Sequence, residues 1–335
     1  MSTPLVSILI PFKNTANYLE DCLESILKQT FTSWEVLIVD DRSTDDSRII
    51  VQRYTDLDSR IHLLNNQGNG IIDALRTAYS HVKGTLITRM DSDDIMMENK
   101  LMKLQKSLQK YGRGYLATGK IRYFSKTGIG DGYKRYQDWL NTLTNNGANF
   151  DEIYKECVIP SPCWMVYKKD FEICGGFESS TYPEDYDLAF RFFKHGLKCI
   201  PNNEVLHLWR DYPSRTSRVD VKYAENSFLE IKVKYFLELS YNSNRELVIW
   251  GAGSKGKKIA KLLIERNLSF DWVCNNPNKI GKQIYNQTLK SFEDLMLLKN
   301  PQCIISVANR NDQTDIKKKL DSLNMSFMSH YYFFC

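Results

Sequence analysis

The 335-residue sequence contains no stretch that approaches the roughly 18 consecutive apolar residues of a membrane-spanning helix. Its first residues, MSTPLVSILIPF, carry neither a basic segment nor a long apolar run, so we expect no signal peptide. None of the eight cysteines forms a C-x-x-C pair. This pattern favours reduced core cysteines in a cytosolic protein over a disulfide framework or a zinc site. The expected location is therefore cytoplasmic, and attachment to the inner face of a membrane stays open.

A strong charge of one sign is also missing. The net charge is only +5 and is spread along the chain, which does not indicate nucleic-acid binding. It is compatible with attraction to anionic lipid or to a phosphorylated substrate. With 42% apolar and 25% charged residues, the composition is that of an ordinary globular protein long enough for two domains. Association with a second copy stays open.

Short apolar runs alternate with helical patterns over the first 90 residues, and the pattern predicts an α/β fold with a mostly parallel sheet. The expected strands cover residues 5–10, 34–39, 61–64 and 85–90, followed by two more within 115–124 and 163–167. The segment 125–150 is rich in Gly, Asn and Thr, and we expect a loop or lid there.

The α/β pattern begins again at Glu246. We therefore expect a first domain over residues 1–215, a connecting helix over 216–244, and a second, smaller Rossmann-like α/β domain over 245–335. In the second domain, the glycine-rich turn from Gly251 to Gly256 follows an expected strand and opens an expected helix, as a dinucleotide-binding fingerprint requires. About twenty residues later, Cys274-Asn275-Asn276 stands where a ribose-binding acid is expected.

Two acidic clusters follow expected strands of the first domain, namely Asp40-Asp41 and the group Asp91, Asp93 and Asp94. Ligands of such sheets bind at the carboxyl ends of the strands. Two clusters of like charge on one edge repel each other unless a positive group lies between them. A third acidic pair, Glu184-Asp185, begins an expected helix, where capping of the helix is an alternative to a chemical role.

Five segments, in order, resemble family 2 glycosyltransferases with the GT-A fold: VSILIPFKN, YLEDCLESILKQTF, WEVLIVDDRSTDDS, KGTLITRMDSDD and GGFE…EDYDLAFRF. The resemblance covers about the first 190 residues. It implies an inverting transfer from a nucleoside-diphosphate sugar, expected to be UDP-linked, with Mn²⁺ or Mg²⁺ as cofactor. The implied acceptor is a glycan or a lipid-linked molecule in bacterial surface polysaccharide synthesis.

The resemblance also implies roles on the donor side. Asp91-Ser92-Asp93 corresponds to the D-x-D motif, with Asp93 as the direct metal ligand and Asp91 on the ribose, the metal or its water. Asp94 would support this loop. Asp41 corresponds to the residue that recognises the base. The nucleotide pocket would include Pro11, Phe12, Asn14, Gly70 and Arg89. Two of these have alternative roles: Phe12 packs either on the base or in the core, and Arg89 either lies near the donor or balances the carboxylates.

Further roles come from later segments. Asp185 corresponds to the catalytic base, and Glu184 either replaces it or holds the acceptor. His207 is a candidate metal ligand or a structural histidine, and Arg210 meets the diphosphate or stabilises its loop. Arg76 stands one helical position away from the family's usual arginine, at Leu75, so its side chain is turned by about 100°.

The second domain looks like small Rossmann-type domains attached to sugar-modifying enzymes. Because the acid is missing at Asn275, we expect a nucleotide-sugar or partner-binding module, or a packing role, and no NAD. Two other functions remain as alternatives: a non-catalytic sugar-nucleotide-binding or scaffold protein that acts through the C-terminal domain, and an NAD-dependent sugar oxidoreductase.

Overall fold

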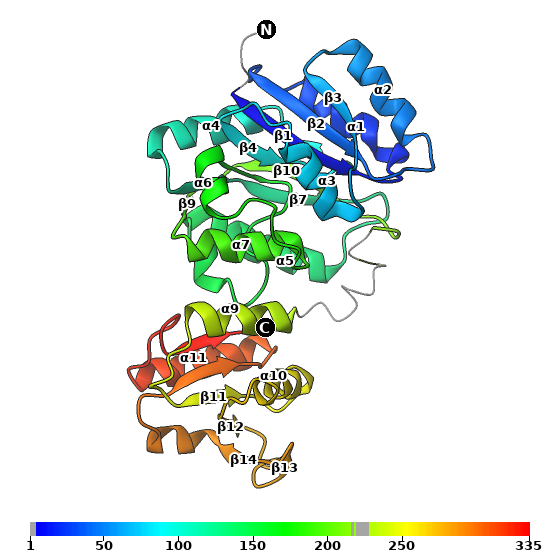
Figure 1. The fold of residues 1–335 in the computed structure, drawn as a ribbon. Helices are drawn as coiled ribbons and strands as arrows, with labels where there is room; N and C mark the ends of the chain where they lie inside the picture. The colour runs from blue at the N-terminus through cyan, green and yellow to red at the C-terminus, as the bar shows by residue number, and fades with distance from the viewer. Residues whose placement is uncertain (1–4, 216–217, 219–227) are drawn as a thin grey trace. The chain divides into compact units, whose positions relative to one another are not determined.

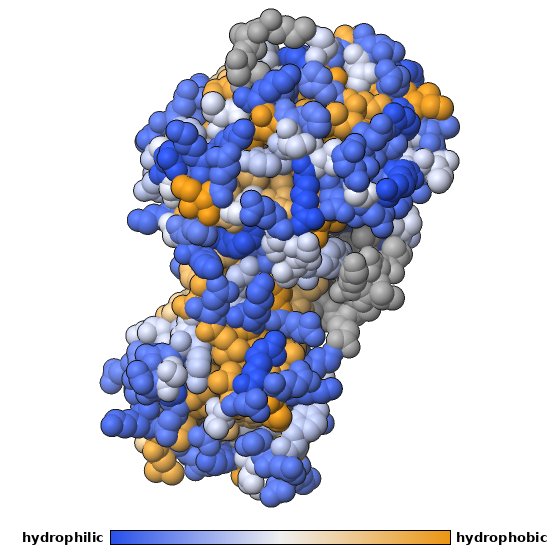
Figure 2. All heavy atoms as spheres, in the orientation of Figure 1, coloured by the Kyte–Doolittle hydropathy of each residue, from blue (hydrophilic) through white to orange (hydrophobic). Residues whose placement is uncertain are grey.

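The computed structural model describes residues 5–215, 218 and 228–335, and these divide into two compact units (Figure 1). Unit 1 holds the described residues up to 150 and those from 157 to 215. Unit 2 holds residues 151–156, 218 and 228–335. Figure 2 shows mostly hydrophilic side chains on the visible face of each unit, interrupted by smaller apolar areas. In the described part of the chain, no helix combines the length and apolar character needed to cross a membrane.

Unit 1 is built on a seven-stranded sheet with the order β3-β2-β1-β4-β8-β6-β9. Strands β1, β2, β3 and β4 are parallel, whereas β8 runs antiparallel to β4 and β6. The mostly parallel α/β fold expected from the sequence is thus confirmed. The strands are β1 Val6–Phe12, β2 Trp34–Asp40, β3 Ile61–Asn65, β4 Leu86–Arg89, β6 Tyr115–Thr118, β8 Trp164–Tyr167 and β9 Lys198–Ile200.

The helices of unit 1 bury apolar stripes against this sheet, and α1 shows the pattern with buried Leu19, Cys22, Leu23 and Ile26. The chain moves from β1 to β3 in one direction and then returns to β4 on the other side of β1. Because crossovers are right-handed, this reversal places α3 on the opposite face from α1 and α2. The helices are α1 Ala16–Leu27, α2 Ser47–Leu57, α3 Gly70–Tyr79, α4 Lys100–Tyr111, α6 Lys168–Ile173 and α7 Glu184–Lys194, with a short 3₁₀ helix η1 at Asn149–Glu152.

A small second sheet, β5-β10-β7, brings a late segment of unit 1 beside the acidic residues that follow β4. It consists of β5 Ile95–Met96, β10 Val205–Arg210 and β7 Lys120–Phe124. In the antiparallel pairing of β5 with β10, His207 lies opposite Met96. This pairing places His207 and Arg210 next to Asp93 and Asp94.

The expectation of a loop over 125–150 is wrong, because helix α5 spans Asp131–Asn146. The composition of α5 is polar, but the side chains that face the rest of unit 1 recur at helical spacing. Tyr133 and Tyr136 pack against the core, and Leu140 and Leu143 are buried. Gly147 ends the helix in the left-handed conformation, at φ 68°. Glycines flank the helix at Gly128, Gly130 and Gly147, whereas Gly132 and Asn141 lie within it.

Unit 2 contains a six-stranded sheet with the order β13-β14-β12-β11-β15-β16. The expected strand at 247–250, the glycine-rich turn and the following helix are all present. The described part of the segment expected to connect the domains forms α9, which belongs to unit 2; residues 216, 217 and 219–227 lie outside the described residues. The elements are α9 Leu229–Leu239, β11 Leu247–Trp250, α10 Ser254–Ile264, β12 Asp271–Cys274, β13 Gln283–Ile284, β14 Gln287–Ser291, the 3₁₀ helix η3 Phe292–Leu297, β15 Gln302–Ile305, α11 Arg310–Ser322 and β16 Tyr331–Phe333.

Candidate active site

The carboxyl ends of three adjacent parallel strands, β1, β2 and β4, place the acidic residues of unit 1 at one edge of the sheet. Phe12 at the end of β1 lies opposite Asp40 at the end of β2, and Asp41 follows directly. On the other side of β1, Arg89 ends β4 opposite Leu9, and Asp91 comes two residues later. The chain order reverses between β1 and β4, which is where ligands of such sheets bind.

The carboxylate of Asp41 is buried and organises the turn that opens α3. It accepts hydrogen bonds from Asn66 Nδ2 at 2.6 Å and from the Gly70 backbone N–H at 3.1 Å and 3.2 Å. Lys13 Nζ lies 3.6 Å away. Since a carboxylate has about four acceptor positions, this arrangement leaves Asp41 able to accept a further N–H.

The three residues at the end of β1 that were expected in the nucleotide pocket have different structural contacts. Asn14 has a positive φ of 53°, and its side-chain oxygen accepts the Thr44 N–H at 2.8 Å. Pro11 pairs with Val39 in the sheet register. The ring of Phe12 is 3% exposed and packs in the hydrophobic core. Of the two roles left open by the sequence, base stacking and core packing, the structure places Phe12 in the second.

Arg89 joins two acidic motifs that are distant in the sequence. Its Nε and Nη2 contact Asp91 Oδ1 at 3.1 Å and 3.0 Å, and its Nη1 donates to Glu184 Oε1 at 2.9 Å. The guanidinium is only 6% exposed. Burial alone would lower the pKa of Arg89, but the surrounding carboxylates outweigh it and raise that pKa above its ordinary value. Arg89 is thus the positive group between the acidic motifs.

Asp93 is half-buried and held from two sides. Tyr212 donates its hydroxyl to Asp93 Oδ2 at 2.8 Å, and Arg210 Nε donates to the Asp93 carbonyl at 2.6 Å. Burial, followed by the charges of Asp94 and Asp91, raises the pKa of Asp93 to about 7. A free carboxylate is therefore disfavoured here unless a further positive charge is present.

Arg210 has its side chain committed to protein groups. Besides the Asp93 carbonyl, it contacts Asp21 Oδ2 at 2.8 Å and lies over the rings of Tyr18 and Phe124. Its backbone N–H donates to Asp94 Oδ1 at 2.8 Å. The arrangement therefore matches the second of its two expected roles, in which it stabilises the acidic loop.

Behind Asp93 lies a fully buried row of Asp94, His207 and Lys100. His207 Nε2 is 2.9 Å from Asp94 Oδ2, and its Nδ1 is 3.3 Å from Lys100 Nζ. Lys100 also donates to the Pro162 carbonyl at 2.5 Å. Burial, together with the neighbouring Lys100, lowers the pKa of His207 well below its usual value, so the ring is neutral. Both ring nitrogens have protein partners in this arrangement.

Glu184 and Asp185 form the first turn of α7. Glu184 Oε1 meets Arg89, whereas Glu184 Oε2 is buried and has no hydrogen-bond partner among the residues that the structure describes. Asp185 Oδ1 accepts the Tyr186 N–H at 2.8 Å. Burial and the charge of Glu184 raise the pKa of Asp185 to about 7, which suits a group that exchanges a proton near neutral pH.

Asp187 and Arg76 have structural partners. Asp187 Oδ2 pairs with Arg191 at 2.8 Å within α7. Arg76 binds the loop before α7 through the carbonyls of Phe177 and Glu178 and the hydroxyl of Ser180, at 2.7–2.9 Å. Its Nη1 also pairs with Asp73 Oδ1 at 2.8 Å, in the first turn of α3.

Three further residues near the acidic motif were not identified from the sequence: Lys100, Tyr212 and Arg215. Lys100 resembles any polar residue at a helix start, and only the fold shows that it is fully buried. Arg215 lies over the Trp209 ring at 5.0 Å, and the Asp94 and Asp93 charges help to raise its pKa. A signal for Arg215 and Tyr212 did exist, because both follow β10 in a segment with alternating aromatic and basic residues.

No group of three or more His, Cys, Asp or Glu side chains in the described parts of the chain is arranged to hold a metal ion by itself. The donor set that is present consists of the carboxylates Asp91 and Asp93. Hard divalent cations take oxygen ligands, and Mg²⁺ is commonly bound by one or two carboxylates together with substrate phosphates. The residues present therefore fit a cation that is shared with a phosphorylated substrate.

Comparison with known proteins gives a consistent result. The model of "Glycosyl transferase family 2" matches residues 7–175. A curated relative, the putative teichuronic acid biosynthesis glycosyltransferase TuaG of Bacillus subtilis, is 37% identical over 244 residues, which cover 71% of this chain and 92% of TuaG.

Two solved structures share the fold of this chain. TarS 1-349 of S. aureus in complex with UDP-GlcNAc has a TM-score of 0.53 at 14% identity and covers 77% of this chain and 71% of its own. The mannosyltransferase PcManGT of Pyrobaculum calidifontis in complex with GDP-Man and Mn²⁺ has a TM-score of 0.51 at 19% identity. The match covers 70% of this chain and 64% of PcManGT.

Proposed function

Because this chain belongs to glycosyl transferase family 2 and is a glycosyltransferase, we propose that it moves a sugar from a nucleoside-diphosphate sugar to a glycan or lipid-linked acceptor, with inversion and with a divalent cation. The two named structural neighbours were solved with UDP-GlcNAc and with GDP-Man plus Mn²⁺, which supports a nucleotide-sugar donor. The relationship to a teichuronic acid enzyme supports a bacterial surface polysaccharide as the product.

One observation carries the proposal: a single buried guanidinium, that of Arg89, contacts both Asp91 and Glu184. In the proposed reaction Asp91 belongs to the donor side, and Glu184 belongs to the acceptor side. A transferase needs both substrates within bonding distance of each other. Arg89 supplies a fixed bridge between the two halves of the site.

On the donor side, we assign the cation to Asp93 and Asp91, with Mn²⁺ or Mg²⁺ as the metal. When bound, such a cation neutralises the diphosphate and the charge that develops on the leaving nucleoside diphosphate. Tyr212 and Arg210 orient Asp93 for this role. His207 has both ring nitrogens engaged, so we assign it the positioning of Asp94 in preference to metal binding.

The nucleotide is assigned to the adjacent edge of the sheet. The Asp41 carboxylate would accept an N–H of the base, while Gly70 and Asn66 hold it in place. Uracil presents such an N–H, which favours a UDP-linked donor. Asn14 and Pro11, at the end of β1, would border the same pocket.

On the acceptor side, Asp185 is the proposed base. The acceptor oxygen attacks the anomeric carbon, the bond from that carbon to the phosphate oxygen breaks, and the hydroxyl proton passes to Asp185. The bonding pair goes to the departing nucleoside diphosphate. The unpartnered Glu184 Oε2 is free to accept a hydrogen bond from an acceptor hydroxyl. A positioned base contributes typically ~10²–10⁴-fold in rate.

The test is release of free nucleotide from a panel of UDP-, GDP- and dTDP-sugars with manganese, magnesium or chelator, first alone and then with saccharide acceptors. We expect metal-dependent release from a UDP-sugar. Asp93→Asn should abolish the metal dependence, whereas Asp185→Asn should keep donor affinity and lower kcat by about 100-fold or more. Asp131→Asn, an exposed carboxylate on α5, is the matched control.

The pH profile adds a second readout. Because Asp185 acts in its ionised form and its pKa is raised to about 7, kcat should rise with pH through neutrality. That rise should disappear in Asp185→Asn. Metal-independent release by the wild type, or a wild-type rate in Asp185→Asn, would overturn the assignment.

A further inference from the structure

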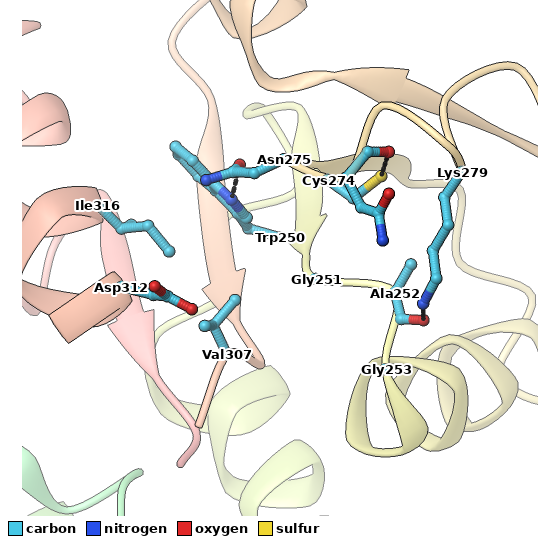
Figure 3. Close-up of a pocket in the computed structure, with 11 residues that line it drawn as sticks. Trp250, Gly251, Ala252, Gly253, Cys274, Asn275, Lys279, Val307, Asp312 and Ile316 are labelled. Carbon is cyan, nitrogen blue, oxygen red and sulfur yellow. Dashed lines mark hydrogen bonds between the residues drawn. The ribbon is translucent and has the colours of Figure 1, made fainter. Parts of the chain in front are cut away.

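A cavity of about 150 Å³ lies in unit 2, at the carboxyl ends of β11, β12 and β15 (Figure 3). Strand β11 is flanked by β12 on one side and by β15 on the other, and the chain reaches these neighbours in opposite directions. The order of the sheet therefore reverses at β11. Open α/β sheets bind their ligands in the crevice at such a reversal.

Two of the glycines in the turn after β11 are required by packing. Gly251 has a φ of 118°, and a Cβ on it would lie 2.5 Å from Ser306 Oγ. A Cβ on Gly256 would lie 2.0 Å from the Gly251 carbonyl oxygen. These glycines bring α10 close to the sheet, and the residue that caps the helix, Gly253, lines the cavity.

Gly253 differs from these two glycines, because the space around it would accept a side chain. A Cβ at this position would meet nothing within 4 Å, and the backbone is extended at φ −85° and ψ −169°, which any residue adopts. Gly253 lines the cavity and directly precedes α10. A glycine here leaves the first N–H groups of the helix open to an anion that approaches from the cavity.

The side chains around the cavity give it two chemically distinct ends. Lys279 reaches over the glycine turn, where its Nζ donates to the Ala252 carbonyl at 3.0 Å. Asp312 comes from the start of α11 on the other side of the cavity (Figure 3). The indole of Trp250 also lines the cavity, but it is only 1% exposed: its ring stacks on Phe292, and its Nε1 donates to Asn275 Oδ1 at 2.9 Å. One end thus offers a cation and the start of α10, and the other offers a carboxylate that accepts hydrogen bonds from hydroxyl groups.

We propose that this cavity binds a phosphorylated sugar, with the phosphoryl group at Gly253 and Lys279 and the hydroxylated ring between Trp250 and Asp312. The ring is either the ribose of a mononucleotide or a hexose. Pockets that enclose a drug-sized ligand measure about 300–1,000 Å³, so a cavity of about 150 Å³ suits one sugar ring with its phosphate, and the base of a mononucleotide would extend outside it. Asn275 after β12 also lacks the charge that a dinucleotide's ribose usually meets.

The test is hydrogen–deuterium exchange on the full chain, which localises binding to unit 2 whatever occurs in unit 1. The probes are UMP, glucose 1-phosphate, inorganic phosphate and NAD⁺. Each is used at about 10 mM, a concentration that populates a weak site with a Kd in the millimolar range. We expect protection of residues 250–256 and 274–280 by UMP or glucose 1-phosphate. The stronger of the two identifies the ring as ribose or hexose.

Two variants make the result specific. Gly253→Asp adds a carboxylate at the cap of α10, where Asp stabilises a helix but repels a phosphate, so we expect unchanged or higher Tm and at least about tenfold weaker protection. Lys279→Met should weaken protection similarly, whereas Lys282→Met, an exposed lysine three residues away, should not.

The proposal does not depend on the transferase reaction of unit 1. It is overturned if none of the probes protects residues 250–256, or if Gly253→Asp binds as well as the wild type. Equal protection by inorganic phosphate would remove the sugar from the proposal, and strongest protection by NAD⁺ would replace it with a dinucleotide site.

Discussion

Among single residues, Arg89 is the buried cation that pairs with both acidic motifs of unit 1. It is buried between Asp91 and Glu184, and neither of these carboxylates has another cation within ion-pair distance among the described residues. Removing one partner of a buried ion pair leaves the other uncompensated, which typically costs about 3–5 kcal/mol. The consequence for function is that both acidic motifs depend on the same side chain for their geometry.

We therefore expect Arg89→Met to lower the free energy of unfolding by about 3–5 kcal/mol. In the background of Glu184→Gln, the same change should cost about 1–3 kcal/mol less, because one of the stranded charges is gone. Denaturant unfolding of the four proteins measures the coupling. The control is Arg53→Met with Glu20→Gln, an exposed pair at 2.7 Å, whose effects should add to within about 0.5 kcal/mol. Additive effects at Arg89 and Glu184 would contradict the bridge.

At the level of elements, the position of α7 depends on a contact from α3. The Arg76 side chain binds Phe177, Glu178 and Ser180 in the loop that leads to Glu184. These three hydrogen bonds join segments about 100 residues apart in the chain. A proposed catalytic carboxylate in the first turn of a helix is only as well placed as the loop before that helix.

We expect Arg76→Met to reduce the free energy of unfolding by about 1–3 kcal/mol and to lower kcat more than it raises KM for the donor. The reason is that three hydrogen bonds of Arg76 hold the loop before the acceptor side, whereas among the described residues on the donor side it reaches only Asp73, which accepts the Asn69 N–H. Lys103→Met, which removes an exposed ion pair with Glu204, is the control and should leave kcat unchanged. Wild-type kcat in folded Arg76→Met would show that the loop holds α7 without this arginine.

Elements also show what could be predicted from the sequence. Strands such as β1 and β2, helix α1 and the acidic ends of β2 and β4 follow from apolar periodicity alone, because each pattern is local. Helix α5 was not predicted, because its many polar residues obscure the helical spacing of the few side chains that pack against the core. The contacts of Arg89 with Glu184, and of Lys100 with His207, join residues 95 and 107 positions apart, and no local pattern reports such pairs.

For the whole molecule, three carboxyl groups of unit 1 give stability an unusual dependence on pH. The pKa values of Asp93 and Asp185 are raised to about 7 and that of Asp94 to about 8, above the 3.8 of a free Asp. The folded chain therefore keeps protons that the unfolded chain releases above about pH 4. Stability contributed by these protonated groups is complete below that pH and is lost as the pH rises towards the folded pKa values. Neutral, buried His207 acts in the opposite direction, because the unfolded chain takes up its proton below about pH 6.5.

A comparison of the wild type with Asp93→Asn isolates the contribution of one carboxyl group to the pH dependence of stability. Asp93→Asn keeps the shape of the side chain and cannot ionise. In chelator, its free energy of unfolding relative to that of the wild type should therefore rise by about 2–3 kcal/mol between pH 5 and pH 8. Urea unfolding at several pH values measures the difference. Asp131→Asn, in which the replaced group is exposed, should follow the wild type at every pH. If the Asp93→Asn curve also ran parallel to the wild type, Asp93 would already be ionised in the metal-free fold, and the site would not need a cation to hold its charge.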